Sequence, residues 1–101
     1  MGAFLMRRSG DYDQLPVLDA FACEGLSPQR WSNGAGDVYA SHRHGYHKVL
    51  FCLRGSIVFT LTETSEAYEL HEGDRLDIEP NTPHAAVVGP HGVTCVEAAR
   101  E

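Results

Sequence analysis

The sequence predicts a single small all-β domain, folded as a sandwich or barrel. From residue 29 onward, short apolar runs are separated by turn residues at close intervals, which is typical of such folds. The run Val49–Leu53 is apolar on both faces of a strand, which indicates burial between two layers. The length of 101 residues suits one compact domain and is too short for two.

The elements are expected in the following order. Residues 1–13 are predicted to be a polar, poorly ordered start, and Gln14–Glu24 a short helical segment that Gly25 ends. Gly55 is expected to form a tight hairpin turn, because glycine accepts a positive φ. The barrel is expected to span about residues 29–98, with strands at Gln29–Ser32, Asp37–Arg43, His47–Leu53, Ser56–Thr62, Tyr68–His71, Arg75–Ile78, His84–Val88 and Val93–Ala98.

Composition narrows the range of partners. The net charge is -6 and the eight Lys and Arg residues are scattered, which argues against a nucleic-acid partner. The longest strongly apolar run is far short of the roughly 20 residues that a membrane helix needs. Cys23, Cys52 and Cys95 are far apart and form no CxxC pair, which is typical of reduced thiols. We therefore expect a soluble, cytoplasmic protein without a membrane partner.

Two alternating histidines form the most informative pattern. Side chains at positions i and i+2 of a strand point to the same face, so His42 and His44 present two imidazoles to one volume. Two such imidazoles make half of a metal site. In an unbroken strand Tyr46 and Lys48 share this face, whereas His47 takes the other.

The spacing around these histidines resembles a known motif. Gly36 precedes His42 by six positions, and Gly55 follows it by thirteen. This arrangement is similar to the first motif of the cupin superfamily: Gly, five residues, His-x-His, three or four residues, Glu, six residues, Gly. The resemblance covers roughly Trp31–Glu97.

A second cupin motif follows at the expected place. It runs Gly, five residues, Pro-x-Gly, two residues, His. Gly73 and His84 match its ends, Glu79 stands in the Pro position, and Asn81 stands in the Gly position. Asn is a reasonable replacement for Gly, because Asn tolerates the left-handed backbone conformation that a tight turn needs.

The resemblance implies a double-stranded β-helix, the cupin jelly-roll barrel, with a short N-terminal helical segment. It also implies that His42, His44 and His84 bind one divalent transition metal, such as Zn, Fe, Ni or Mn, inside the barrel. Three imidazoles with open coordination positions describe a catalytic rather than a closed structural site. The position of the family's glutamate is occupied here by Lys48.

Several outcomes are open for Lys48. Its ammonium opposes a metal, but the side chain could lose its proton, bend away, or pair with a bound anionic substrate. Alternatively, a β-bulge at Gly45 could shift the register, turning Lys48 outward and His47 inward.

Three functional hypotheses follow. The first is a metal-dependent dioxygenase or isomerase of a small organic acid or carbonyl compound, with Lys48 and Tyr46 as the predicted catalytic and substrate-binding residues. The second is a non-catalytic cupin that binds a small ligand. The third is a metal-free pocket in which Lys48 acts as base or Schiff-base former. A homodimer is expected, because open sheet edges are commonly covered by symmetric pairing.

Overall fold

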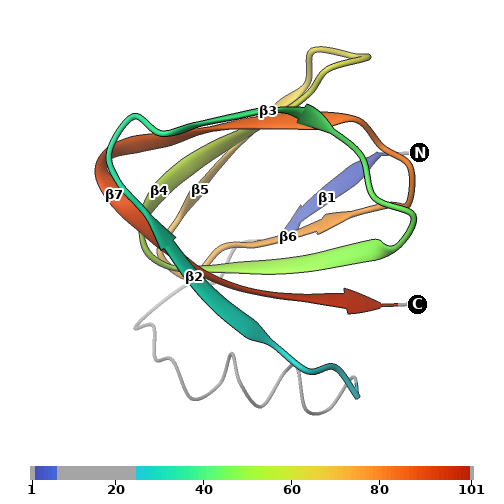
Figure 1. Ribbon diagram of the computed structural model, residues 1–101, viewed down its shortest axis with the longest axis horizontal. Coiled ribbons are helices and arrows are strands. Elements are labelled where there is room, and N and C mark those ends of the chain that lie inside the picture. Colours follow the sequence, from blue (N-terminus) through green and yellow to red (C-terminus); the bar gives the residue numbers. More distant parts are fainter. Residues whose placement is uncertain (1, 7–24, 101) are drawn as a thin grey trace.

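The computed structural model describes residues 2–6 and 25–100. In these ranges every regular element is a strand, which confirms the all-β class (Figure 1). The helical segment predicted for Gln14–Glu24 lies outside the described residues. The strands are β1 (Ala3–Met6), β2 (Gln29–Asn33), β3 (Val38–His42), β4 (His47–Leu61), β5 (Ala67–His71), β6 (Arg75–Ile78) and β7 (His84–Arg100).

The two longest strands correct the sequence prediction. A hairpin turn was expected at Gly55 and another turn at residues 89–92, but β4 and β7 continue through both places and pair with each other along their length. The register shifts on either side of Gly55, which has φ 74°. A Cβ atom there would lie 2.0 Å from the carbonyl oxygen of Gly92. Gly55 therefore lets two backbones approach and bends the ribbon instead of reversing it.

This bend divides the continuous sheet into two halves that face each other (Figure 1). In one half, β2 pairs with the end of β7, and the start of β4 pairs with β6. In the other half, β3 pairs with the start of β7, and the end of β4 pairs with β5. The result is a barrel whose two walls share β4 and β7.

The chain start departs from its prediction. Ala3–Met6 was expected to belong to a poorly ordered start, but it forms β1 and pairs with β6 in the register Ala3↔Ile78. Residues 7–13 lie outside the described residues. β1 thereby extends the wall formed by β6 and the start of β4.

The main core lies between the two walls, and a smaller apolar cluster lies on the outer face of β4 and β7. Leu50 and Cys52 of β4 face the main core, whereas Val49, Phe51 and Leu53 join the outer cluster. The prediction that this run is apolar on both faces is therefore confirmed. The main core comprises Leu50, Cys52, Ile57, Phe59, Leu70, Leu76, Ile78, Ala86, Val88, Val93 and Cys95.

Two of the three cysteines belong to this core. Cys52 and Cys95 face each other across β4 and β7, and both are fully buried free thiols, as expected for small apolar residues. The hydrogen bond between the two thiols, together with burial, holds the pKa of Cys95 far above its ordinary value. Cys23 lies outside the described residues.

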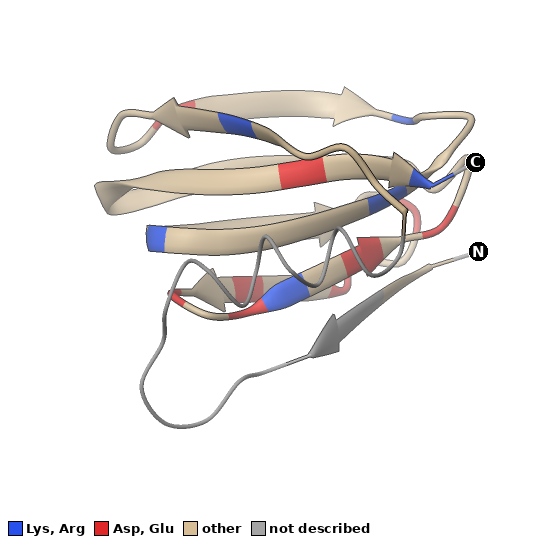
Figure 2. Cartoon of the chain, turned by 90° about the horizontal axis from the view of Figure 1, so that it is seen from below, with Lys and Arg blue, Asp and Glu red and all other residues tan. Residues whose placement is uncertain are grey.

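Acidic and basic side chains are interspersed along the described strands (Figure 2). Among the described residues, no helix has the length and apolar character needed to cross a membrane.

Candidate metal centre and adjoining cavity

Three histidines converge at one end of the barrel. His42 ends β3, His44 lies in the loop that follows, and His84 begins β7. His42 and His84 are cross-strand partners, and the ring centroids of the three imidazoles lie 4.4 to 5.3 Å apart. The convergence predicted from the sequence is confirmed.

Hydrogen bonds to the backbone orient two of these imidazoles. His84 Nδ1 lies 2.8 Å from the carbonyl oxygen of Thr82, and His42 Nδ1 lies 2.9 Å from that of Ala40. A carbonyl oxygen can only accept, so each Nδ1 carries a proton, and the neutral form of each ring has its lone pair on Nε2. This is the usual outer arrangement of a metal-binding histidine.

Two of the ring nitrogens are buried without a partner among the described residues. The Nε2 atoms of His44 and His84 are shielded from solvent, and no hydrogen-bond partner for either lies in residues 2–6 or 25–100. Leaving a buried polar atom unpaired is costly, so its presence indicates a site for something else to bind. A divalent metal would supply that partner.

Burial also keeps two imidazoles in the form that binds metal. Desolvation lowers the pKa of His44, and the nearby Lys48 ammonium lowers it further. Desolvation likewise lowers the pKa of His84, although its hydrogen bond to Thr82 acts in the opposite direction. Both rings are therefore neutral at neutral pH, as coordination requires.

The three ligand nitrogens lie within 4.8 Å of one another. Two nitrogens that bind one ion at about 2.1 Å each can be at most about 4.2 Å apart. Ligand nitrogens that lie close to 4.8 Å apart must therefore move slightly toward each other when the ion binds. His42 is exposed and can rotate to do so. The cluster could therefore hold one divalent metal.

The second motif supports this cluster through the backbone. Asn81 has φ 60°, which confirms the left-handed conformation predicted for the position. Its N–H donates to the carbonyl oxygen of His44 at 2.6 Å. The turn before β7 thus fastens the loop that carries His44.

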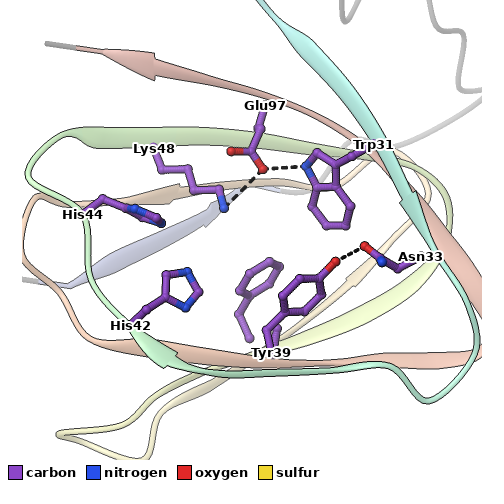
Figure 3. A pocket seen from close by; sticks show the side chains of 9 residues that line it. Trp31, Asn33, Tyr39, His42, His44, Lys48 and Glu97 are labelled. Carbon is purple, nitrogen blue, oxygen red and sulfur yellow. Dashed lines mark hydrogen bonds and ion pairs between the residues drawn. The ribbon is translucent and has the colours of Figure 1, made fainter.

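A cavity of about 240 Å³ adjoins the histidines (Figure 3). This volume is below the roughly 300 to 1,000 Å³ of pockets for drug-sized ligands, so the cavity suits a small molecule. Its walls are largely aromatic, and the indole ring of Trp31 meets Tyr39 edge to face at 6.0 Å. The lining residues are Trp31, Asn33, Tyr39, His42, His44, Lys48, Phe59, Ala86 and Glu97.

Lys48 points into this cavity. It is buried, with 7% of the residue exposed, and lines the same space as His42 and His44. His47 points to the opposite face, where its Nε2 lies 2.9 Å from Asp77 Oδ2. The face predicted from strand parity is confirmed, and the alternative of a register shift at Gly45 is wrong.

Glu97 is the residue that sequence reasoning missed. Its Oε1 lies 3.2 Å from Lys48 Nζ and accepts a hydrogen bond from Trp31 Nε1 (Figure 3). This carboxylate neutralises the ammonium that was expected to oppose a metal. A signal existed, since Glu97 is the one charged residue in the predicted strand Val93–Ala98 and shares a face with the buried Cys95.

Tyr46 occupies a different place from the one predicted. Its ring stacks on the imidazole of His44, with centroids 4.8 Å apart. It borders a second hollow rather than the cavity that Lys48 lines. Burial raises the pKa of its hydroxyl, and Glu97 raises it further. Tyr46 therefore supports the orientation of His44, and its catalytic role stays a prediction.

Comparison with solved structures gives several matches with the same fold. The polyketide cyclase RemF from Streptomyces resistomycificus is 20% identical with a TM-score of 0.66, over 75% of this chain and 55% of that one. The DMSP lyase DddQ from Ruegeria pomeroyi DSS-3 is 24% identical with a TM-score of 0.68, over 75% and 38%. A cupin superfamily protein from Desulfitobacterium hafniense DCB-2 is 13% identical with a TM-score of 0.65, over 96% and 75%.

At these identities the structural likeness concerns the fold alone, and the chain spans little more than half the length of the cyclase. No curated protein matches the chain. A sequence model of the cupin domain, however, matches residues 30–94, which is more than half of the chain and contains all three histidines. The motif spacing, the bent two-walled barrel and this match agree: the chain belongs to the cupin family.

Proposed function

We propose that this protein is a metal-dependent enzyme that moves a proton within a small organic acid or carbonyl compound, as an isomerase does. The observation that carries the proposal is the convergence of three imidazoles, two of them with buried and unpaired Nε2 atoms, beside a small cavity. His42, His44 and His84 would hold the metal. The Lewis acidity of a bound divalent ion would polarise a substrate oxygen.

The charged residues of the cavity suit such chemistry. The ammonium of Lys48 can stabilise the negative charge that develops on an enolate or carboxylate. Glu97 and Tyr39 place groups able to accept or donate a proton on the lining of the same cavity. These groups favour proton transfer over dioxygenation, which needs no such pair.

The structural neighbours are consistent with this class. A polyketide cyclase and a DMSP lyase share the fold, so cyclase and lyase chemistry both occur on it. The metal-free hypothesis is less favoured, because Lys48 is engaged with Glu97 and is not a free nucleophile. A non-catalytic binder would use the same cavity, and a homodimer remains part of the proposal.

The first test is metal content. Protein purified without an affinity tag should contain one transition-metal ion per chain by elemental analysis. His84→Ala should lower metal affinity by orders of magnitude, because it removes one of three ligands. His71→Ala, a change at an exposed histidine of β5, should leave affinity unchanged. Equal affinity in parent and His84→Ala would disprove the ligand set.

The second test addresses the chemistry. Small keto acids, hydroxy acids and aldehydes are incubated in deuterated water with the metal-loaded protein, and deuterium incorporation is followed by NMR. Exchange at the carbon next to a carbonyl is expected, and it should disappear in His84→Ala. Oxygen consumption without exchange would instead indicate dioxygenation. Ligand binding with neither reaction would indicate a binding module.

A further inference from the structure

The ion pair inside the cavity is incompletely satisfied. Lys48 Nζ lies 3.2 Å from Glu97 Oε1, which is longer than the roughly 2.7 to 2.9 Å of a strong charge-assisted bond. Trp31 Nε1 donates to the same oxygen. Within the part of the chain that the structure describes, neither contact uses Oε2. Both the ammonium and the carboxylate therefore retain capacity to bind another group.

Glu97 stands at the boundary between two spaces. It lines the cavity beside the histidines and also a hollow of about 450 Å³ that Tyr46 and Gln29 border. The Glu97 side chain is 24% exposed, whereas that of Lys48 is 9% exposed. A small rotation of Glu97 can therefore hydrate its carboxylate in the second hollow, but Lys48 has no comparable route to water.

Other contacts hold the two partners in place independently. Trp31 binds Glu97 without involving Lys48. Lys48 Nζ lies 5.9 Å from the centroid of the Phe59 ring, a favourable position for an ammonium over an aromatic face. If the two charges separate, each side chain keeps one of its contacts.

We propose that Lys48 and Glu97 form an exchangeable ion pair. Glu97 neutralises Lys48 in the ligand-free protein, and the carboxylate of a small organic acid takes its place at Lys48 Nζ while Trp31 retains Glu97. The inference rests on the proposed function, since the other end of the acid would face the histidines. The exchange keeps the buried ammonium paired throughout, which avoids the cost of an isolated buried charge.

The electrostatics of the loaded site favour an anionic ligand. Lys48 and Glu97 cancel each other, and imidazoles that coordinate a metal are neutral, so a bound divalent ion would leave the cavity with a net positive charge. The aromatic walls and the volume of about 240 Å³ restrict the ligand to a small carboxylate. The Glu97 carboxylate thus competes with the ligand for Lys48, and a small organic acid must displace it in order to bind.

The main test measures binding of formate and acetate by calorimetry, with and without added zinc. The proteins are the parent, Glu97→Gln and Lys48→Met. The amide introduced by Glu97→Gln would keep an oxygen for Trp31 but lose the charge that competes for Lys48. Acetate affinity should therefore rise roughly tenfold or more in Glu97→Gln and disappear in Lys48→Met. Unchanged or weaker acetate binding in Glu97→Gln overturns the proposal.

Unfolding midpoints supply a second readout, because Glu97→Gln leaves a buried ammonium without its carboxylate. At matched ionic strength, acetate should raise the Tm of Glu97→Gln more than that of the parent. Asp77→Asn is the matched control, since it removes a carboxylate from an ion pair outside the cavity. Acetate should raise the Tm of Asp77→Asn by no more than it raises that of the parent. Equal shifts in all three proteins overturn the exchange.

Measurements on the metal-free protein distinguish a failure of this inference from a failure of the proposed function. Acetate binding to metal-free Glu97→Gln needs only Lys48, so it supports the exchange even if the parent binds no metal. Conversely, zinc binding by the parent together with an unchanged acetate affinity in Glu97→Gln retains the metal site and overturns the exchange.

Discussion

Two adjacent residues of β4, His47 and Lys48, contact carboxylates on opposite faces of the barrel wall. On the outer face, Asp77 accepts hydrogen bonds from Arg75 Nε at 2.6 Å, Arg75 Nη2 at 3.0 Å and His47 Nε2 at 2.9 Å. On the inner face, Glu97 contacts Lys48 at 3.2 Å through an oxygen that it also shares with an indole. The outer carboxylate uses both oxygens, and the inner one uses a single oxygen.

This difference separates a pair whose hydrogen bonds are all made within the barrel wall from a pair that retains an oxygen for a ligand. Asp77 ties β6 to β4, and its side chain is only 7% exposed, so its three hydrogen bonds satisfy a group that water does not reach. Glu97 borders two hollows and has an oxygen to spare. A buried polar network that is fully satisfied specifies one structure, whereas one that is partly satisfied and open to a cavity can accept a ligand.

The largest expected effect breaks the outer pair. Asp77→Asn should lower the free energy of unfolding by about 3 kcal/mol, because it removes the charge of a buried carboxylate that accepts three hydrogen bonds. Glu97→Gln should cost less, since Glu97 makes one contact with Lys48 at 3.2 Å, whereas Asp77 accepts three hydrogen bonds. Urea unfolding of both variants measures the difference. A greater loss in Glu97→Gln would contradict this distinction between the two pairs.

Acid should weaken the same outer pair. Burial raises the pKa of Asp77, but hydrogen bonds from Arg75 and His47 outweigh it, so the pKa lies below its ordinary value of 3.8. A carboxylate whose pKa is lowered by folding stabilises the folded protein at pH values above its ordinary pKa. This stabilisation disappears as the pH falls through the lower pKa of the folded state. The stability gap between parent and Asp77→Asn should therefore shrink below pH 3.8. A gap that stays constant down to full acid unfolding would assign the loss to packing instead.

The role of the inner ion pair can be tested by reversing the charge at Lys48. Lys48→Glu removes a cation and adds a carboxylate on the face of the histidines, so zinc affinity should rise roughly tenfold while acetate binding is lost. Arg54→Glu makes the same charge change at an exposed position of β4 and should alter neither. Calorimetry with zinc and acetate measures both. Unchanged zinc affinity in Lys48→Glu would show that this position does not tune the metal site.

The parts of the site that the sequence predicted depend on short-range geometry. His42, His44 and Lys48 are separated by even numbers of positions, so strand parity predicted a common face for them, and all three line one cavity although His44 lies in the loop between β3 and β4. The left-handed backbone of Asn81 was also predictable, because few residues tolerate it. His84 required the resemblance to a second motif.

The parts that the sequence did not predict depend on which backbones meet. A glycine such as Gly55 is compatible with either a hairpin turn or a bend in a continuous strand. The close approach of Gly92 favours the bend, and Gly92 lies opposite Gly55 only in the folded chain. Glu97 escaped notice for a related reason. It lies in β7, and its partner Lys48 lies in β4, so the two residues meet only in the folded chain.

The smallest expected effect concerns the turn that fastens His44. Asn81→Gly should change the free energy of unfolding by no more than about 0.5 kcal/mol, because glycine adopts the observed φ of 60° and keeps the N–H that bonds to the carbonyl oxygen of His44. Asn81→Ala should cost about 1 kcal/mol, since a Cβ without a compensating amide is disfavoured in the left-handed region. Urea unfolding gives both values, and zinc titration gives the consequence for the site. Zinc affinity should be the same in Asn81→Gly and the parent, because the backbone alone positions the loop. A severalfold loss in Asn81→Gly would mean that the amide side chain itself holds His44 in place.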